Sequence, residues 1–402
     1  MIKKVFYGKI HRKQKDELDC LWFFYGLHTK TKKIKMKKRS KTSKLWSLLF
    51  FLVNLIVVGV VFAIQINSEA GVGSFKEFFN KNNNLEFILI VVGCFIISQI
   101  LIGFRLNALS LKFGKKSNYL SCVKSEFICQ YYNKITPFSF GGQPFQVFEL
   151  TKCGVKANNA IAMVSCNYVS QKLIYWVVAL FMMLTIATNP IIESMSGASF
   201  RIVLVLAIIS LVSMSIFLTF VILVCLNKKL ASKLVALTIN FLNKLKIVKN
   251  RKKVYFKIMR PALSFQHKMK VFFTSKKFAI FSLALSLVIY IIQSSIPAFI
   301  YFIFEPFNLT TYWQLLSVGV IIQLSFGVNP IPGGSGVAEL SFSALFALLI
   351  DKSYVFWALI LWRILTYYIY LIFGIGIVSY DYIYGNKKAK RRKQKLKSMN
   401  NI

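Results

Sequence analysis

Acidic residues are scarce in this sequence: its 402 residues include 13 Asp and Glu against 52 Lys and Arg. Histidine is scarcer still, because only His11, His28 and His267 are present, and they lie far apart in basic segments. The seven cysteines are scattered and no pair has CxxC spacing, which disfavours both disulfides and a zinc site. The sequence therefore predicts no metal site, and we assign no catalytic residues and no cofactor.

A polar stretch long enough to bury a core of its own is also missing. Instead, 56% of the residues are hydrophobic. Residues 45–66, 85–104 and 200–226 form unbroken apolar runs of the roughly 20 residues that cross a hydrocarbon core about 30 Å thick. Further spans are predicted at residues 158–187, 278–304 and 354–380. The predicted fold class is all-α: a polytopic helical membrane protein with about six full spans.

The net charge of +39 is concentrated in four basic blocks. These blocks are residues 3–44, 105–156, 228–277 and 387–397, and each adjoins the end of a predicted span. The positive-inside rule places all four blocks, and hence both termini, in the cytoplasm. Basic blocks at such positions also attract anionic lipid. We expect no nucleic-acid binding, since neither aromatic stacking platforms nor a folded reader domain is visible.

The same features divide the chain into three parts. Residues 1–44 form a basic cytoplasmic leader, residues 45–385 an integral membrane domain, and residues 386–402 a basic cytoplasmic tail. Within the membrane domain, a first half (45–226) and a second half (278–385) are separated by a basic cytoplasmic loop (227–277). Two interpretations of residues 1–34 stay open, an upstream mis-start or a short interfacial segment, because Met36 would itself make a normal start.

Two apolar segments are interrupted by residues that break helices. The first lies between spans that border the cytoplasm, and the second, at 313–350, is too short for two crossings and borders the outside. Proline removes a hydrogen-bond donor and glycine permits tight turns, so each segment can enter the membrane and return on the same side. The predicted breaks are Pro137, Gly141, Gly142 and Pro144 in the first segment, and Pro330, Pro332, Gly333, Gly334 and Gly336 in the second.

The two breaks, TPFSFGGQPFQVFEL and NPIPGGSGVAEL, have the same plan. Each runs from a polar residue and proline through Gly-Gly to Glu-Leu. Related breaks approached from opposite faces are typical of an inverted repeat, and they are the best sequence pointer to a transporter's binding site. Helix N-termini at the breaks would favour an anionic headgroup. The alternative is tight interhelical packing; a nucleotide-binding P-loop is disfavoured because G-K-[ST] is missing.

Five ionisable residues fall within the apolar segments, where charge is costly and usually functional. They are the candidate substrate-binding residues Glu149, Glu339, Arg363, Lys172 and Arg105. As a hypothesis, cations and helix N-termini bind the phosphate of a lipid headgroup, and carboxylates bind its amine. Two alternatives remain open: a structural ion pair for Arg363, and an interfacial anchor role for Arg105.

The stretches NKITPFSFGGQPFQVFEL and NPIPGGSGVAELSFSALF, with an arginine near the close of the second span and another in the last span, resemble the lysylphosphatidylglycerol synthase/flippase transmembrane family. The resemblance covers about residues 40–385. The matched positions are Pro137, Gly141, Gly142, Pro330, Pro332, Gly333, Gly334, Gly336, Glu339, Arg105 and Arg363. Where many relatives have Glu-Arg after the first break, this chain has Gln171-Lys172, which keeps the cation and loses the acid.

The resemblance implies the membrane half of bacterial proteins that make lysyl-phosphatidylglycerol and move it to the outer leaflet, which resists cationic antimicrobial peptides. Full-length members carry a cytoplasmic transferase domain that uses aminoacyl-tRNA, whereas this chain ends in KAKRRKQKLKSMNNI. We therefore expect a flippase in the bacterial cytoplasmic membrane, with both termini cytoplasmic.

Two alternatives to the flippase remain: a phosphatidylglycerol lysyltransferase component, alone or with a separate synthase, and a non-transporting scaffold. The expected partners are an anionic or aminoacylated membrane phospholipid and a separate synthase. Contact with tRNA is expected only through such a partner, and the oligomeric state stays open.

Overall fold

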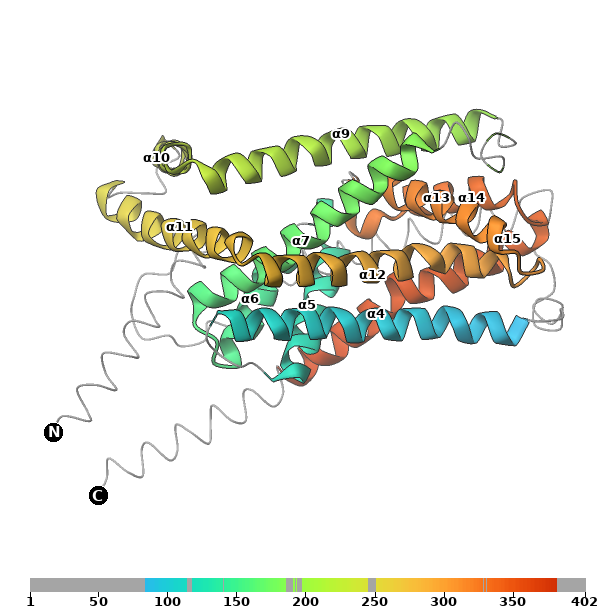
Figure 1. Ribbon diagram of the computed structural model, residues 1–402, viewed down its shortest axis with the longest axis horizontal. Helices are drawn as coiled ribbons and strands as arrows, with labels where there is room; N and C mark the ends of the chain where they lie inside the picture. The colour runs from blue at the N-terminus through green and yellow to red at the C-terminus, as the bar shows by residue number, and fades with distance from the viewer. Residues whose placement is uncertain are drawn as a thin grey trace, which may run out of the picture.

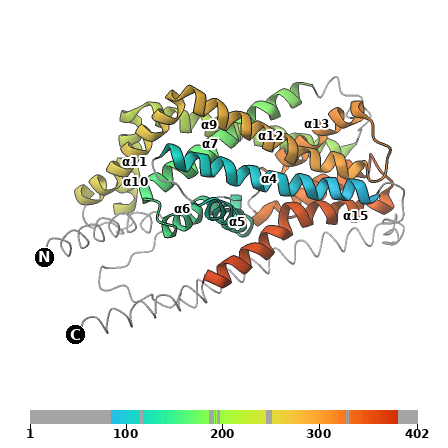
Figure 2. The same ribbon diagram turned by 60° about the horizontal axis from the view of Figure 1, so that its bottom comes forward.

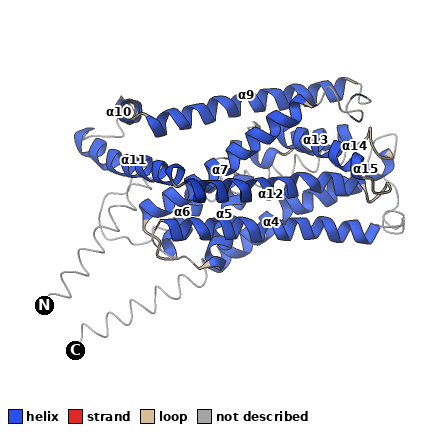
Figure 3. Cartoon of the chain, viewed as in Figure 1, coloured by secondary structure: helices blue, strands red, loops and turns tan. Residues whose placement is uncertain are grey.

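The computed structural model describes residues 84–113, 118–139, 141–185, 197–244, 251–327 and 331–381, together with residues 191, 193 and 329. All regular secondary structure in these ranges is helical, as Figure 3 shows. The predicted all-α membrane class is confirmed. The predicted first span at 45–66, the leader, the tail and Pro330 lie outside the described residues.

Five described helices are long and apolar enough to cross a membrane. They are α4 (Asn84–Lys112), α7 (Ala157–Leu184), α9 (Ala198–Leu226), α12 (Lys276–Tyr301) and the last helix, Lys352–Asp381, which begins with α15 (Lys352–Arg363) and continues through a π-helical turn, η4 (Ile364–Tyr368). These five match the second to sixth spans that the sequence predicts. In Figure 1, α4, α9 and α12 run along the long axis of the molecule.

Helix α9 illustrates why such segments need lipid around them. Its residues Ile202, Val205, Ile209, Val212 and Ile216 are each more than half exposed. Their spacing of three and four places them on one helical face. An apolar face of this length would be unfavourable in water and is favourable against acyl chains. Helix α9 itself lies at the upper edge of the molecule in Figure 1.

The two broken segments form two helical hairpins of matching design. The first contains α5 (Tyr119–Ile135), the short 3₁₀ turn η1 (Pro137–Ser139) and α6 (Gly142–Lys152); the second contains α13 (Leu309–Ser325), η3 (Pro332–Gly334) and α14 (Val337–Phe346). Both first arms have 17 residues. Each also starts at an asparagine cap, Asn118 or Asn308, whose side chain accepts a hydrogen bond from the backbone two residues later.

The hairpins enter the bundle from opposite ends. Figure 1 shows α5 and α6 toward the end where α10 and α11 lie, and α13 and α14 toward the other end. The two short turns, η1 and η3, pack against each other where the hairpins meet. The opposite entry of the two breaks, predicted from charge and length, is therefore confirmed.

The basic segment at 227–277, predicted as a loop, is largely helical. It forms α10 (Lys228–Lys244) and α11 (Arg251–Thr274). In α10, Leu230, Leu234 and Leu237 recur at helical spacing between the lysines, and this amphipathic pattern favours a helix although the segment is too polar to cross the membrane. Figure 1 shows α10 end-on, crosswise to α9.

The far part of the last helix passes beside α5. The turned view in Figure 2 shows this helix running obliquely below α4 and α5. A methyl group at Gly374 would overlap the ring of Tyr131 on α5, so the two helices approach closely there. The last helix thus contacts the first hairpin as well as the second, and it links the two breaks.

Candidate functional site

The second break lies between the end of α5 and the last helix. Gly333 has a φ of +68°, which side-chain-bearing residues rarely adopt. A methyl group there would overlap the Tyr367 ring and lie 3.1 Å from the carbonyl oxygen of Lys134. Glycine is therefore required at this position both for its conformation and for the close approach of three segments.

A buried ion pair holds the start of α14 to the last helix. Glu339 Oε2 lies 2.6 Å from Arg363 Nη2, and both side chains are almost fully buried. The same carboxylate oxygen accepts a hydrogen bond of 2.7 Å from the backbone N–H of Gly336 and so caps α14. The structural ion pair left open for Arg363 is present, and Glu339 is its carboxylate.

Side chains of the protein occupy the first backbone donors at the breaks. Gly142 N–H donates to Asn133 Oδ1 at 2.8 Å, and Gly141 N–H donates to Thr136 Oγ1 at 3.0 Å. At the other break, Glu339 takes the donor of Gly336. We expected these helix N-termini to bind an anionic headgroup. Their first backbone N–H groups instead donate to side chains of the protein. A methyl group at Gly142 would overlap the Cys129 carbonyl oxygen, so tight packing accounts for this glycine.

Glu149 lies apart from Glu339. It belongs to an ionic cluster of four residues, Lys124, Glu149, Lys152 and Asp381, in which each lysine contacts both carboxylates at 2.7 to 3.1 Å. The two glutamates lie apart because their helices begin at different distances before them: α6 begins at Gly142 and α14 at Val337. Glu149 therefore lies two turns into its helix, whereas Glu339 lies in the first turn.

The environment of Lys152 shows how the ionic cluster balances its charges. Burial lowers the pKa of this lysine, but its hydrogen bonds to Glu149 and Asp381 outweigh that effect and raise the pKa above its usual value. The lysine therefore stays charged. With two lysines and two carboxylates, the ionic cluster is neutral as a whole and joins α5, α6 and the last helix.

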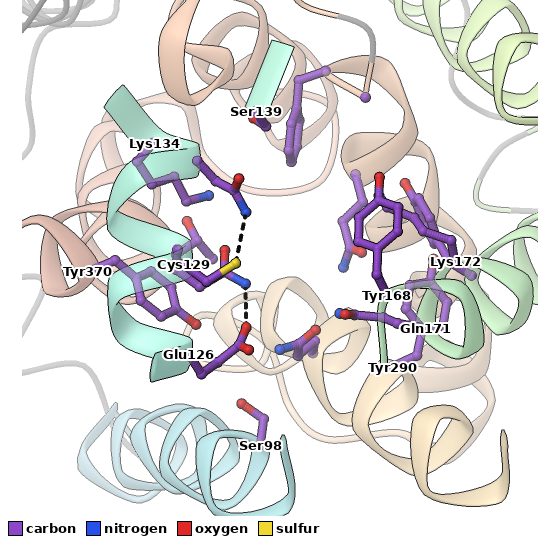
Figure 4. A pocket seen from close by; sticks show the side chains of 18 of the residues that line it. Ser98, Glu126, Cys129, Lys134, Ser139, Tyr168, Gln171, Lys172, Tyr290 and Tyr370 are labelled. Carbon is purple, nitrogen blue, oxygen red and sulfur yellow. Dashed lines mark hydrogen bonds between the residues drawn. The ribbon is translucent and has the colours of Figure 1, made fainter. Parts of the chain in front are cut away.

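A cavity of about 360 Å³ opens among α4, α5, α6, α7, α12, α13 and the last helix. Figure 4 shows its side chains converging from several of these helices. Carboxamides dominate its polar lining. They are Gln130, Asn133, Gln143, Gln146, Asn167, Gln171, Gln293 and Gln323. So many amides amid membrane spans indicate a site for a polar group, because unsatisfied polar groups are costly in hydrocarbon.

Glu126 is the carboxylate of the cavity. Its Oε1 accepts a hydrogen bond from Gln130 Nε2 and its Oε2 accepts one from Gln146 Nε2, both at 2.8 Å. The side chain thereby links α5 to α6 across the first hairpin. Figure 4 places it on the same wall of the cavity as Lys134. Glu126 was not among the residues selected from the sequence.

Two lysines line the cavity from opposite walls, Lys134 on α5 and Lys172 on α7 (Figure 4). The ammonium of Lys172 lies 5.7 Å and 5.3 Å from the ring centres of Tyr168 and Tyr175. Lys134 lies 6.0 Å from the ring centre of Tyr370. Such contacts stabilise a cation where water is limited. Lys172, a candidate from the sequence, is therefore part of the cavity.

Arg105 lies behind the cavity rather than in it. The residue is 1% exposed. Its Nε donates to Asn167 Oδ1 at 2.8 Å and its Nη1 donates to Ser286 Oγ at 2.6 Å. A buried arginine that joins α4, α7 and α12 is not an interfacial anchor. It orients Asn167, which lines the cavity.

The turn η1 borders the cavity in an unusual conformation. Phe138 and Ser139 both have a φ of 55° and both line the cavity. Residues with side chains cost on the order of 1–3 kcal/mol each in such regions and concentrate at functional sites. The strain therefore falls where the first break meets the cavity.

A helical period in polar residues could have indicated the cavity. Glu126, Gln130 and Lys134 follow one another at intervals of four, as do Asn167 and Gln171, so each set shares a helix face.

Among the described residues, no group of three or more His, Cys, Asp and Glu is placed to hold a metal ion.

Comparison with known proteins gives one match. No curated protein and no solved structure matches the chain. Residues 44–374 match the family described as lysylphosphatidylglycerol synthase TM region. The matched range takes in four of the five described spans, residues 352–374 of the last helix, both hairpins and the cavity. The chain therefore belongs to the family of the lysylphosphatidylglycerol synthase transmembrane region.

Proposed function

We propose that this protein is a lipid translocator that moves lysyl-phosphatidylglycerol or a related phospholipid between the leaflets of the bacterial cytoplasmic membrane. The observation that carries the proposal is the amide-lined cavity beside the point where the two hairpins meet. A phospholipid cannot cross hydrocarbon easily because its headgroup is polar and charged. A polar cavity at membrane depth lowers that barrier, while the acyl chains stay in the bilayer.

The size of the cavity fits a headgroup. Its volume of about 360 Å³ lies at the lower end of the about 300–1,000 Å³ that is typical of small-molecule sites. This space accommodates a phosphate and its polar substituent and excludes acyl chains, so the chains would remain outside among the apolar faces of the helices.

The hairpins supply a route for alternating access. One hairpin lies toward each end of the bundle, and both contact the last helix through ion pairs: Lys124 and Lys152 with Asp381 in the ionic cluster, and Glu339 with Arg363 at α14. Rocking of the two inverted halves around the cavity would open one end at a time. Delivery of an aminoacylated lipid to the outer leaflet would lower the negative surface charge and resist cationic antimicrobial peptides.

The family description favours a second candidate, because it names a synthase. In that case the chain would contribute to lysyl transfer to phosphatidylglycerol, alone or with a separate synthase. Lipid analysis of cells with and without the gene separates the candidates. A translocator leaves total lysyl-phosphatidylglycerol unchanged and depletes the outer leaflet, a synthase component removes the lipid altogether, and a scaffold changes neither.

Reconstitution tests the proposed function directly. The purified full chain is placed in vesicles that contain a fluorescent phospholipid, and a membrane-impermeant quencher reports how fast inner-leaflet lipid reaches the outside. Translocation should be faster than in protein-free vesicles, and replacement of Gln143 and Gln171 by leucine should slow it because the cavity loses two of its eight carboxamides. The variant Leu237→Gln, at an exposed position on α10, is the control. Equal rates with and without protein, for every lipid tried, would contradict the proposal.

A further inference from the structure

The charges of the cavity lining are unbalanced. Its charged side chains are Glu126, Lys134 and Lys172, so the lining carries one positive charge in excess. Within the described part of the chain, no carboxylate lies within ion-pair distance of either lysine. A ligand that neutralises this site must bring negative charge with it.

The carboxylate of the cavity is already engaged by the protein. Each oxygen of Glu126 accepts an amide N–H, from Gln130 and from Gln146. The positive charge of the buried Arg105 also acts on Glu126. A ligand ammonium would therefore have to compete with two hydrogen bonds and a fixed positive charge, which makes Glu126 a poor counter-ion for a cationic ligand.

Three of the tyrosine rings that could hold a ligand ammonium already lie near a lysine of the protein. Quaternary and primary ammonium groups bind over tyrosine faces, but Lys172 already lies over Tyr168 and Tyr175, and Lys134 lies near Tyr370. In Figure 4 the two lysines lie on opposite walls with open space between them. This arrangement suits a phosphate bound between two ammonium groups.

The remaining lining suits hydroxyl groups. Each of the eight carboxamides both donates and accepts hydrogen bonds, as a hydroxyl does. We propose that the cavity selects a net anionic, hydroxyl-bearing phospholipid headgroup of the phosphoglycerol type over the aminoacylated form of the same lipid. The lysines bind the phosphate and the amides bind the glycerol hydroxyls. This inference rests on the proposed translocator function and names the substrate class of that site.

The aminoacylated form fits less well for electrostatic reasons. A lysyl ester adds two ammonium groups to the headgroup, and its net charge becomes positive. Placed beside Lys134 and Lys172 in a site of low dielectric constant, these groups meet like charges, and the remaining carboxylate is engaged. The lysyl ester also replaces one glycerol hydroxyl that the amides would bind, so charge and hydrogen bonding both favour phosphatidylglycerol.

A competition experiment tests the selectivity. The purified full chain is equilibrated with equal amounts of phosphatidylglycerol and lysyl-phosphatidylglycerol of identical acyl chains, and native mass spectrometry counts the retained lipids. The expected preference for phosphatidylglycerol is about tenfold, the effect of one added like-charge interaction at moderate dielectric constant. Equal retention, or retention of the lysyl lipid, would overturn the inference. A further arm adds glycerol phosphate, which is the same headgroup without acyl chains: it should compete only when in large excess, and binding as tight as that of the lipid would overturn the assignment to a lipid.

Variants locate the selectivity in the cavity. The double variant Lys134→Gln, Lys172→Gln should lose most of the preference, whereas Lys229→Gln, an exposed lysine on α10, should keep it. Glu126→Gln should strengthen the preference because the lining gains a further net positive charge. If the double variant does not fold, Glu126→Gln decides: an unchanged or weaker preference contradicts the inference.

The two proposals can fail separately. If reconstituted protein translocates lysyl-phosphatidylglycerol faster than phosphatidylglycerol, the selectivity is wrong and the translocator function stands. If phosphatidylglycerol binds preferentially and no lipid crosses the vesicle membrane, the selectivity stands and the translocator function is wrong.

Discussion

Glu339 and Arg363 form an ion pair of 2.6 Å between α14 and the last helix, at a depth where both side chains are almost fully buried. Arg363 directly precedes the π-helical turn η4, and Tyr367, within that turn, lies against Gly333. Turns of this kind often occur at functional sites. The second break is therefore fixed to the last helix at two points, one ionic and one steric.

Removing only one charge of the ion pair should lower the free energy of unfolding more than removing both charges together. Glu339→Gln leaves the guanidinium of Arg363 buried without a counter-charge, and we expect a loss of about 3–5 kcal/mol in the free energy of unfolding. Arg363→Met should cost a similar amount. Thermal unfolding in detergent measures both. The double variant should lose less than the sum of the single variants, and additive losses would show that the two charges do not stabilise each other.

Gly333→Ala should destabilise the junction of the two breaks. The added methyl group overlaps the Tyr367 ring, and the φ of +68° disfavours any side chain. We expect a loss of about 1–3 kcal/mol and slower lipid translocation. Gly376→Ala is the matched control, because nothing lies within 4 Å of the added methyl group there. Equal thermal stability of the two variants would contradict the steric role of Gly333.

The spans and breaks could be predicted because they depend on local properties. A run of apolar residues predicts a span whatever surrounds it, and Pro332 with Gly333 interrupts a helix in most contexts. Their opposite entry followed from the distribution of lysines along the chain. The prediction of a loop at 227–277 was wrong, because it was based on the many lysines there and did not take account of the helical spacing of leucines in α10.

The partners of the charged residues could not be predicted, because they depend on packing. Lys124 and Asp381 pair although 257 positions separate them. Glu149 was matched to Glu339 by its place after Gly-Gly, yet the register of its helix turns it toward Lys152 instead. The cavity was missed for another reason: most of its polar residues are uncharged, and its lining is assembled from seven helices.

Glu126 and Glu149 should differ in their effect on lipid preference. Both are buried carboxylates in the first hairpin, but only Glu126 lines the cavity. Glu126→Gln should reduce binding of lysyl-phosphatidylglycerol by about tenfold, whereas Glu149→Gln should leave the ratio of bound lipids unchanged. Retained-lipid analysis measures that ratio. A larger change in Glu149→Gln would place the ionic cluster, rather than the cavity, in contact with the headgroup.

Arg105 should act through Asn167. Arg105→Lys keeps the charge but cannot donate to Asn167 and Ser286 together, because the planar fork of the guanidinium is lost. We expect a loss of stability of about 1–3 kcal/mol and weaker lipid binding. Lys112→Gln, an exposed lysine at the end of α4, is the control for charge on the same helix.

A positioning role for Arg105 makes a prediction that a purely structural role does not. If Arg105 affects the lipid only by orienting Asn167, the losses in lipid affinity from Arg105→Lys and Asn167→Ala should not add, since each removes the same oriented amide. Affinity is measured by lipid titration at a temperature where all the variants are folded. Additive losses would mean that Arg105 influences the headgroup by another path. Unchanged affinity in Arg105→Lys, with stability alone reduced, would mean that the arginine only holds α4, α7 and α12 together.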